Sequence, residues 1–142
     1  MRPNWDEYFL SIAHTASKRS SCTRKQVGCV LVHDRGILST GYGGSLRGQP
    51  HCLDEGCSDG PTNPCTRTVH AEVNAVAFAA KKGTSTAGAT AYITLSPCPA
   101  CFKLFVQAGI VRIVYDELYR IPPDLALAAA CGVEMVHLPQ AR

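Results

Sequence analysis

A histidine, a glutamate and two cysteines stand out because their types and spacing could build a catalytic metal site. His70 and Glu72 form an H-x-E motif, and Pro97 precedes a C-x-x-C motif made by Cys98 and Cys101. One imidazole and two thiolates supply three ligands for tetrahedral zinc and leave the fourth position open, as catalytic zinc sites do. Zinc lowers the pKa of bound water toward roughly 7. Glu72 would then be a carboxylate beside the metal that moves protons without binding it.

Each half of this pattern has a simpler interpretation when it is taken alone. An isolated histidine is more often a hydrogen-bonded core residue, and an isolated C-x-x-C pair can be part of a structural zinc site or a redox dithiol. Both halves together, with a proline before the first cysteine, form the signature of zinc deaminases. The competing class is a non-catalytic zinc-binding module. Glu72 argues against that class, because a structural zinc has no use for a free carboxylate.

The flanking residues predict two helices that begin at this site. Residues 69–82 have high helix propensity and end at a glycine, which places His70 and Glu72 in the first turn of a helix. The β-rich segment 89–95 leads into a second predicted helix at 98–109. The N-terminal dipole of that helix favours the thiolate forms of its two cysteines. Two helix starts are therefore expected to meet at one metal ion.

The remaining pattern predicts one α/β domain, residues 1–142, with a mixed five-stranded sheet between helices. Aromatic and apolar residues recur at helical spacing in the first segment, and we expect that stripe to face the core. Two early strands form a hairpin closed by an Asp-Arg-Gly turn, and strands that alternate with helices should run parallel. The further predicted elements are a helix at 5–17, strands at 27–33 and 37–42, a strand at 111–115, a helix near 124–131 and a strand at 133–138.

Composition narrows the class of protein. The chain has 142 residues, 46% of them hydrophobic and 18% charged, with a net charge of +3. This balance is typical of a soluble globular domain, and the charge is too small to indicate a nucleic-acid partner. The N-terminus does not resemble a signal peptide, and the longest apolar stretch, 125–133, is too short to cross a bilayer. We expect a cytoplasmic protein without a membrane or nucleic-acid partner.

Eight cysteines raise the question of a second metal site. In a reducing compartment, metal binding explains clustered cysteines better than disulfides do. Cys29 and Cys131 lie in apolar runs and are interpreted as small buried hydrophobic residues. The four that remain match a closed tetrahedral zinc site, and most of them fall in an insert at about 43–68 that lacks periodicity. They are Cys22, Cys52, Cys57 and Cys65, with His51 as a possible replacement for one thiolate and free loop thiols as the alternative.

Short motifs along nearly the whole chain match one known family. They are Val27-Gly28, residues 40–44, the cysteine-bearing residues 51–65, residues 67–75 around the H-x-E motif, the P-C-x-x-C motif, residues 107–109 and Tyr119-Arg120. In these motifs the sequence resembles deoxycytidylate (dCMP) deaminases of the bacterial and phage type, within the cytidine deaminase superfamily. The zinc motif alone would also fit nucleoside, tRNA adenosine, guanine and riboflavin-pathway deaminases. The insert and the His-Ala-Glu-x-Asn-Ala form select the dCMP group.

The resemblance implies a cytidine-deaminase-like three-layer α/β/α fold and a hydrolytic reaction. Zinc-bound hydroxide would attack C4 of cytosine while Glu72 protonates N3 and then the departing amine, which yields dUMP and ammonia. Arg24 matches a position implicated in gripping the nucleotide phosphate, with a solvated basic turn as the alternative. Tyr119 matches an aromatic residue near the base and sugar, and Ala71 and Gly43 occupy further substrate-binding positions. Members are commonly hexamers, and dCTP and dTTP often act as their effectors.

One position departs from the family pattern. The usual Gly-Tyr-Asn-Gly turn has Gly43 in place of the asparagine. A lost side chain that hydrogen-bonds substrate can change discrimination strongly. The alternatives are therefore a modified pyrimidine nucleotide or another amino-bearing heterocycle as substrate. A nucleic-acid base deaminase is a further alternative, although the modest charge does not indicate a basic groove.

Overall fold

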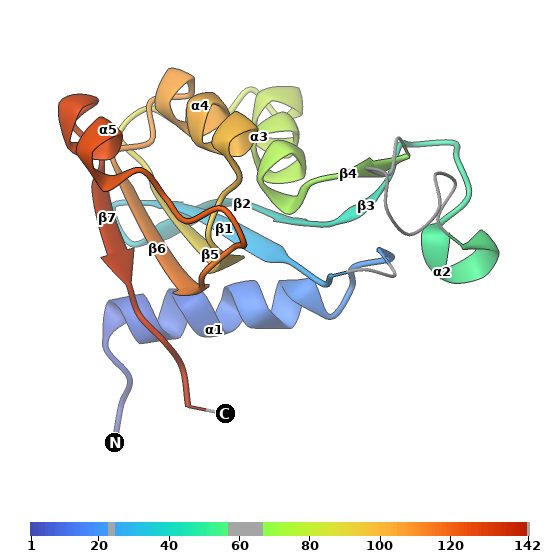
Figure 1. Ribbon diagram of the computed structural model, residues 1–142, viewed down its shortest axis with the longest axis horizontal. Coiled ribbons are helices and arrows are strands. Elements are labelled where there is room, and N and C mark those ends of the chain that lie inside the picture. The colour runs from blue at the N-terminus through green and yellow to red at the C-terminus, as the bar shows by residue number, and fades with distance from the viewer. Residues whose placement is uncertain (23–24, 57–66, 142) are drawn as a thin grey trace.

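The computed structural model describes residues 1–22, 25–56 and 67–141. Its core is a five-stranded sheet in the order β2-β1-β5-β6-β7 (Figure 1). The elements are α1 (Trp5–Ser17), β1 (Gly28–His33), β2 (Gly36–Tyr42), β3 (Gly44–Ser45), α2 (Cys52–Glu55), β4 (Thr68–Val69), α3 (Ala71–Lys81), β5 (Thr90–Leu95), α4 (Pro99–Gln107), β6 (Arg112–Glu117), α5 (Leu125–Ala130) and β7 (Glu134–His137).

The mixed sheet follows the predicted pattern. β1 is antiparallel to both β2 and β5, while β5, β6 and β7 are parallel to one another. The hairpin between β1 and β2 turns at Asp34 and Arg35, whose φ angles are 51° and 62°. Two successive positive φ angles are typical of the type I′ turn that suits the twist of a hairpin. The predicted mixed sheet and its parallel half are confirmed.

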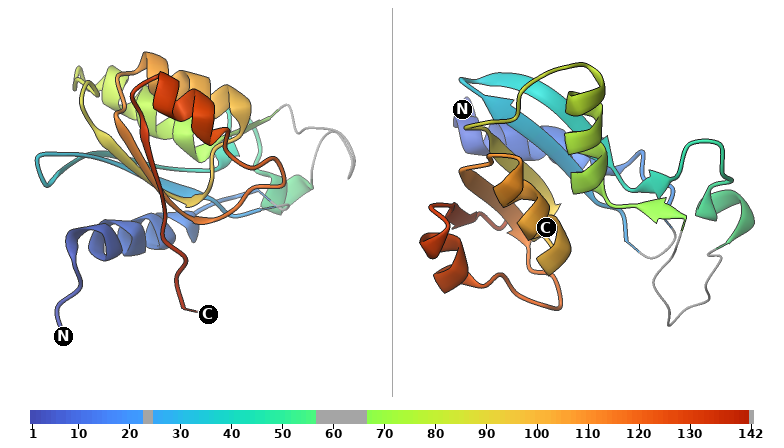
Figure 2. Two further views of the ribbon diagram at one scale, coloured as in Figure 1. Left: turned by 60° about the vertical axis from the view of Figure 1, so that its left-hand side comes forward. Right: turned by 90° about the horizontal axis from the view of Figure 1, so that it is seen from above.

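Helices cover both faces of the sheet. α1 lies on one face, and α3, α4 and α5 lie on the other (Figures 1 and 2). Successive side chains of a strand point to opposite faces of the sheet, so neighbouring residues of β5 pack into two different hydrophobic cores. Tyr92 packs with Phe9 of α1, whereas Ile93 belongs to the cluster that contains Phe105 of α4. The result is the three-layer α/β/α arrangement that the sequence predicts.

The approach of α3 to β2 depends on a glycine. A Cβ atom at Gly41 would overlap the carbonyl oxygen of Ala71 and the backbone nitrogen of Ala75. The Ser39 hydroxyl, on the same strand, donates to the Ala75 carbonyl at 2.7 Å. Since only glycine leaves room for backbone at this distance, Gly41 determines how closely the helix that begins after His70 sits on the sheet.

Three sequence expectations need correction. The insert at about 43–68 is not wholly irregular, because β3 and β4 form a short ladder and α2 lies between them in the chain. These elements extend beyond one end of the main sheet (Figure 1). The aromatic stripe of α1 is only partly core. Trp5 and Tyr8 are 49% and 43% exposed because the buried side of the helix begins at Phe9.

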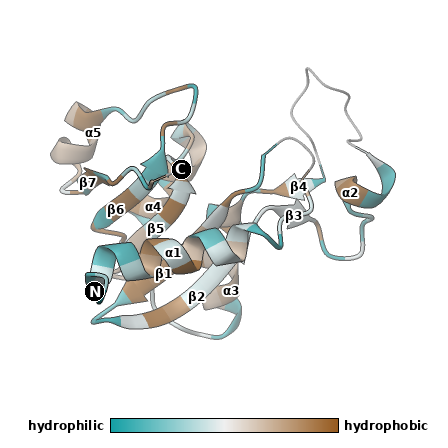
Figure 3. Ribbon diagram, turned by 90° about the horizontal axis from the view of Figure 1, so that it is seen from below, coloured by the Kyte–Doolittle hydropathy of each residue, from teal (hydrophilic) through white to brown (hydrophobic). Residues whose placement is uncertain are grey.

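Cys131 is exposed rather than buried. It caps α5, a helix that is hydrophobic along its length but buries only Ala128 (Figure 3). Cys29, by contrast, is fully buried as expected. Within the described residues, no helix combines the length and apolar character needed to cross a membrane.

A charged clamp ties the start of α1 to the sheet. Both carboxylate oxygens of Asp6 accept hydrogen bonds from the Arg112 guanidinium, at 2.8 and 2.7 Å, and the Tyr92 hydroxyl donates to Oδ1 at 2.7 Å. The hydrogen bonds from Arg112 lower the pKa of Asp6, against the opposing effect of burial. Bidentate pairs of this kind are the strong class of charged hydrogen bond.

We predict that Asp6→Asn lowers the free energy of unfolding by about 1–2 kcal/mol near neutral pH, since a partly exposed charged pair is discounted for solvent screening. Because the folded-state pKa of Asp6 lies below its unfolded value of about 3.9, the difference is fully present above that value. It disappears as the pH falls through the folded-state pKa. Urea unfolding of both proteins across acid pH measures this. Glu7→Gln, on the exposed side of the same turn, is the control, and an unchanged gap at low pH would contradict the assignment.

Candidate active site

His70 and Glu72 stand where β4 passes into α3. His70 is the N-cap of α3 with extended backbone, rather than a residue of the first turn as predicted, and its side chain is exposed. Glu72 lies in that first turn and is only 4% exposed. The change from extended to helical backbone separates the two side chains. His70 therefore points out of the helix start, while Glu72 turns inward toward the core.

Cys98 and Cys101 stand where β5 passes into α4. Cys98 is the N-cap, Pro99 occupies the start of the helix and Cys101 lies in the first turn. A proline suits this position because its fixed φ angle fits a helix start and its missing N–H has no partner there. Cys98 is half-buried and Cys101 is buried. The predicted meeting of two helix starts is thus present in the fold.

The three proposed ligand atoms form a compact triangle. The Nδ1 atom of His70 lies 3.3 Å from Sγ of Cys101 and 3.7 Å from Sγ of Cys98. All three ligand atoms are within 4.8 Å of one another. Tetrahedral zinc with bonds of about 2.0–2.1 Å to nitrogen and about 2.3 Å to sulfur separates such atoms by roughly 3.6 Å. These three residues therefore fit a zinc ion, which would have one further tetrahedral position without a ligand among them.

Burial and the Glu72 carboxyl together set the electrostatics around the triangle. Burial raises the pKa of Glu72, and a backbone hydrogen bond, the charge of His70 and the hydrogen bond with Cys101 only partly oppose this. Burial, followed by the charges of Glu72 and Cys98, raises the pKa of Cys101. Burial and Glu72 likewise raise the pKa of Cys29 beneath them. A buried carboxylate beside two thiols is costly without a cation, so this arrangement favours a bound metal ion.

The Gly-rich turn is attached to α3 by Asn74. Its amide Nδ2 donates to the carbonyl of Tyr42 at 2.8 Å and to that of Val69 at 3.4 Å. One side chain thus joins the residue before Gly43 to the residue before His70. The sequence motif includes Asn74, but it does not reveal this role, because the acceptor on Tyr42 lies 32 positions away.

Gly43 itself is buried and its space is already occupied. Its N–H donates to the Val27 carbonyl, and its carbonyl accepts from Ser21. A Cβ atom at this position would lie 3.2 Å from the Ser20 hydroxyl, which is 1% exposed. A larger residue at 43 would therefore require Ser20 to shift.

The other predicted substrate-binding residues lie in different environments. Ala71 is 1% exposed, between the two functional residues of α3. Tyr119 follows β6 and is half-buried, with the Arg120 Nε donating to its hydroxyl at 3.1 Å. Arg24, the predicted phosphate contact, lies outside the described residues.

The predicted second zinc site is only partly within the described structure. Cys22 is half-buried and Cys52 is 1% exposed, whereas Cys57 and Cys65 lie outside the described residues. The N–H of Leu53 donates to the Ser21 carbonyl at 3.1 Å, which brings the two described cysteine segments side by side. His51 directs Nδ1 to the Ser21 hydroxyl at 2.7 Å.

Comparison with known proteins agrees with the geometry. Residues 3–117 match the family model of the cytidine and deoxycytidylate deaminase zinc-binding region. The chain belongs to this family of zinc-dependent hydrolytic deaminases.

Three individual proteins show which members of this family the chain resembles. The chain is 42% identical over 127 residues to deoxycytidylate deaminase of Mycobacterium phage D29, covering 82% of this chain and 97% of the relative. It is 40% identical over 142 residues to ComE operon protein 2 of Bacillus subtilis, covering 98% and 75% respectively. A crystal structure of dCMP deaminase from cyanophage S-TIM5 in complex with dCMP and dUMP aligns with a TM-score of 0.84 and 34% identity, covering 97% of this chain and 99% of that one.

We predict that Glu72→Gln and Cys98→Ser fail in different ways. Glu72→Gln keeps zinc, because the carboxylate is not a ligand, but turnover falls by about 100- to 10,000-fold through loss of proton transfer. Cys98→Ser loses the metal and activity together. Zinc content by elemental analysis, measured beside ammonia release, separates the two outcomes. Loss of zinc from Glu72→Gln would mean that Glu72 is a ligand.

Proposed function

We propose that this protein hydrolyses dCMP to dUMP and ammonia. The observation that carries the proposal is the His70, Cys98 and Cys101 triangle with a buried carboxylate at its edge. Membership of the deaminase family also supports hydrolytic deamination as the reaction. Two relatives named as dCMP deaminases, those of Mycobacterium phage D29 and cyanophage S-TIM5, are matched over 97% and 99% of their own length, and they support dCMP as the substrate.

In the proposed mechanism the protein side chains hold the metal and move protons. His70, Cys98 and Cys101 would hold a zinc ion, which would supply a Lewis acid able to make a water molecule nucleophilic near neutral pH. Glu72 would accept one proton from the water and pass it to N3 of cytosine, and would then take the second proton from the oxygen that has joined C4 and pass it to the leaving amine. Burial raises the pKa of the Glu72 carboxyl, and a raised pKa makes a carboxylate a better proton acceptor. The oxygen of water joins C4 and the C4–N bond breaks.

The substrate contacts are proposals that rest on the family resemblance. Arg24 is proposed to bind the 5′-phosphate, since its planar guanidinium can engage phosphate oxygens in pairs. Tyr119 is proposed to pack against the base and sugar, with Ala71 and Gly43 at the walls of the site. The close approach of Ser20 to Gly43 supports a site in which position 43 does not carry the asparagine that is usual in the family.

Further properties remain proposals on the same basis. They are a structural zinc on Cys22, Cys52, Cys57 and Cys65, assembly into a homo-oligomer such as a hexamer, control by dCTP and dTTP, and a cytoplasmic location. The pairing of the Cys22 and Cys52 segments through Leu53 and Ser21 supports the structural zinc. Ser21 engages Nδ1 of His51, so Nε2 is the ring nitrogen that could replace one thiolate.

We predict that dCMP is turned over far better than deoxycytidine, because binding of the phosphate contributes to transition-state stabilisation. Ammonia release is measured over a panel of nucleotides, nucleosides and free bases, including 5-substituted dCMP analogues. Glu72→Gln protein is the matched control for contaminating deaminases. Release from another heterocycle but not from dCMP would overturn the substrate assignment. Preference for a 5-substituted analogue would favour a modified pyrimidine nucleotide.

We predict that Cys52→Ser lowers the zinc content from about two ions per chain to about one, as expected for loss of a structural thiolate site. The melting temperature falls as well, because the metal contributes to folding of the insert. Cys131→Ser is the matched control, since that thiol is exposed on α5. One zinc ion per chain in the parent protein would rule out the second site.

A further inference from the structure

The segment after β6 is held to the fold at very few points. Residues 118–123 have no helix or strand, and Leu118, Arg120 and Ile121 are exposed. Among the described residues, one hydrogen bond joins the backbone of this segment to the rest of the fold. The N–H of Tyr119 donates to the hydroxyl of Ser96 at 2.7 Å. The position of Tyr119 therefore depends strongly on Ser96.

Ser96 is well placed to set that position. It is 2% exposed and is separated from Cys98 only by the buried Pro97. Its own N–H donates to the Glu117 carbonyl at 2.8 Å. The backbone and the side chain of Ser96 thus hydrogen-bond to Glu117 and Tyr119, which are two residues apart. Because a proline follows it, the residue has little freedom to follow a moving loop.

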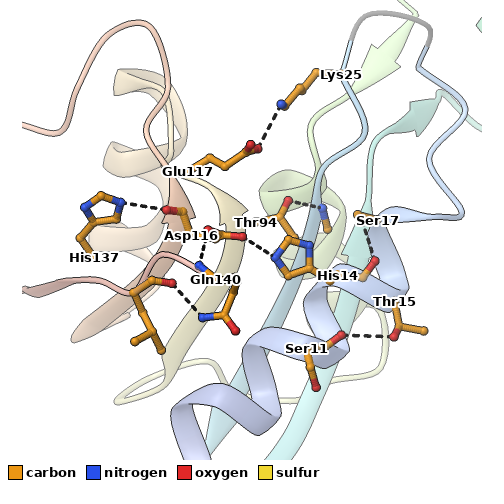
Figure 4. A network of polar contacts seen from close by, with 12 residues as sticks. Ser11, His14, Thr15, Ser17, Lys25, Thr94, Asp116, Glu117, His137 and Gln140 are labelled. Atoms are coloured by element: carbon orange, nitrogen blue, oxygen red, sulfur yellow. Dashed lines mark hydrogen bonds and ion pairs between the residues drawn. The ribbon is translucent and has the colours of Figure 1, made fainter. Parts of the chain in front are cut away.

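The strand before this segment is anchored independently. The Asp116 carboxylate binds Nε2 of His14 at 2.7 Å and accepts from the Gln140 N–H at 2.9 Å (Figure 4). The Asp116 carbonyl is 2.8 Å from Nε2 of His137. Glu117 also pairs with Lys25 at 3.1 Å. These contacts, with the bond from the Ser96 N–H, hold β6 up to Glu117 without the Ser96 hydroxyl, so that hydroxyl acts on the residues that follow.

We propose that Ser96 is a positioning residue that holds Tyr119 at a fixed place beside the turn into α4 that carries Cys98 and Cys101. The inference rests on the proposed function, in which Tyr119 contacts the nucleotide. Tyr119 is only half-buried, so water can replace the Ser96 hydroxyl as acceptor. Removing the hydroxyl therefore releases the loop while leaving the fold intact. A binding contact that is lost in this way raises KM more than it lowers kcat.

The test compares Ser96→Ala with Thr94→Ala in the zinc-loaded enzyme. Thr94 is the matched control, because it carries a buried hydroxyl two residues before Ser96, in β5, and accepts the N–H of Gly28 at 3.2 Å (Figure 4). We expect Ser96→Ala to raise KM about tenfold, equivalent to about 1.4 kcal/mol, with zinc content and kcat near those of the parent. Thr94→Ala should leave KM unchanged. Equal KM in Ser96→Ala and the parent would overturn the proposal.

A double-mutant cycle and amide exchange separate positioning from general stability. If Ser96 acts through Tyr119, then Ser96→Ala adds little to the KM of Tyr119→Ala, and additive effects would overturn the proposal. Amide hydrogen exchange of Tyr119, followed by NMR, should accelerate in Ser96→Ala but not in Thr94→Ala. Unchanged exchange would also overturn it.

The exchange measurement does not depend on dCMP. If the parent enzyme ignores dCMP, the proposed substrate fails, and the kinetic comparison is made with whichever compound of the panel releases ammonia. Faster exchange with a raised KM for that compound would support the role of Ser96. Faster exchange with an unchanged KM would overturn it.

Discussion

The placement of α3 on the edge of the sheet is the constraint on which the site depends. This helix begins at His70 and carries Glu72, so a small shift would move both residues relative to the two cysteines of α4. Gly41 lets the helix backbone approach β2 without a Cβ atom between them. Ser39 then bonds to the middle of the helix, and Asn74 attaches its first turns to the end of the same strand.

The second helix start is set by the sheet itself. β5 is central, paired with β1 on one side and β6 on the other, and it delivers Cys98 directly into the N-terminus of α4. Brought together in this way, two thiols and an imidazole lie beside a buried carboxylate. Burial disfavours each anion in isolation. A divalent cation reverses that balance, which explains how a compact core can contain Glu72 and two cysteines at one place.

The segments around the site differ in the number of hydrogen bonds that anchor them. β6 is anchored through Asp116 to α1 and to the C-terminal residues. The segment after Glu117, by contrast, is held through Ser96 alone in the described backbone. An enzyme that must admit and release a nucleotide needs some segment of low local stability. The loop that carries Tyr119 has that character, while the metal ligands stand at the starts of α3 and α4.

The sequence by itself determined the zinc motif, the alternation of helices and strands, and the mixed sheet, because these depend on local periodicity and on fixed spacing. It also placed α1 at its observed bounds. Only the tertiary structure decided that His70 caps its helix, that Cys131 and Trp5 are exposed, and that Ser20 fills the space beside Gly43. The roles of Asn74 and Ser96 belong to this second group. Their hydrogen-bond partners lie 32 and 23 positions away, and no local pattern encodes a contact that chain folding alone brings together.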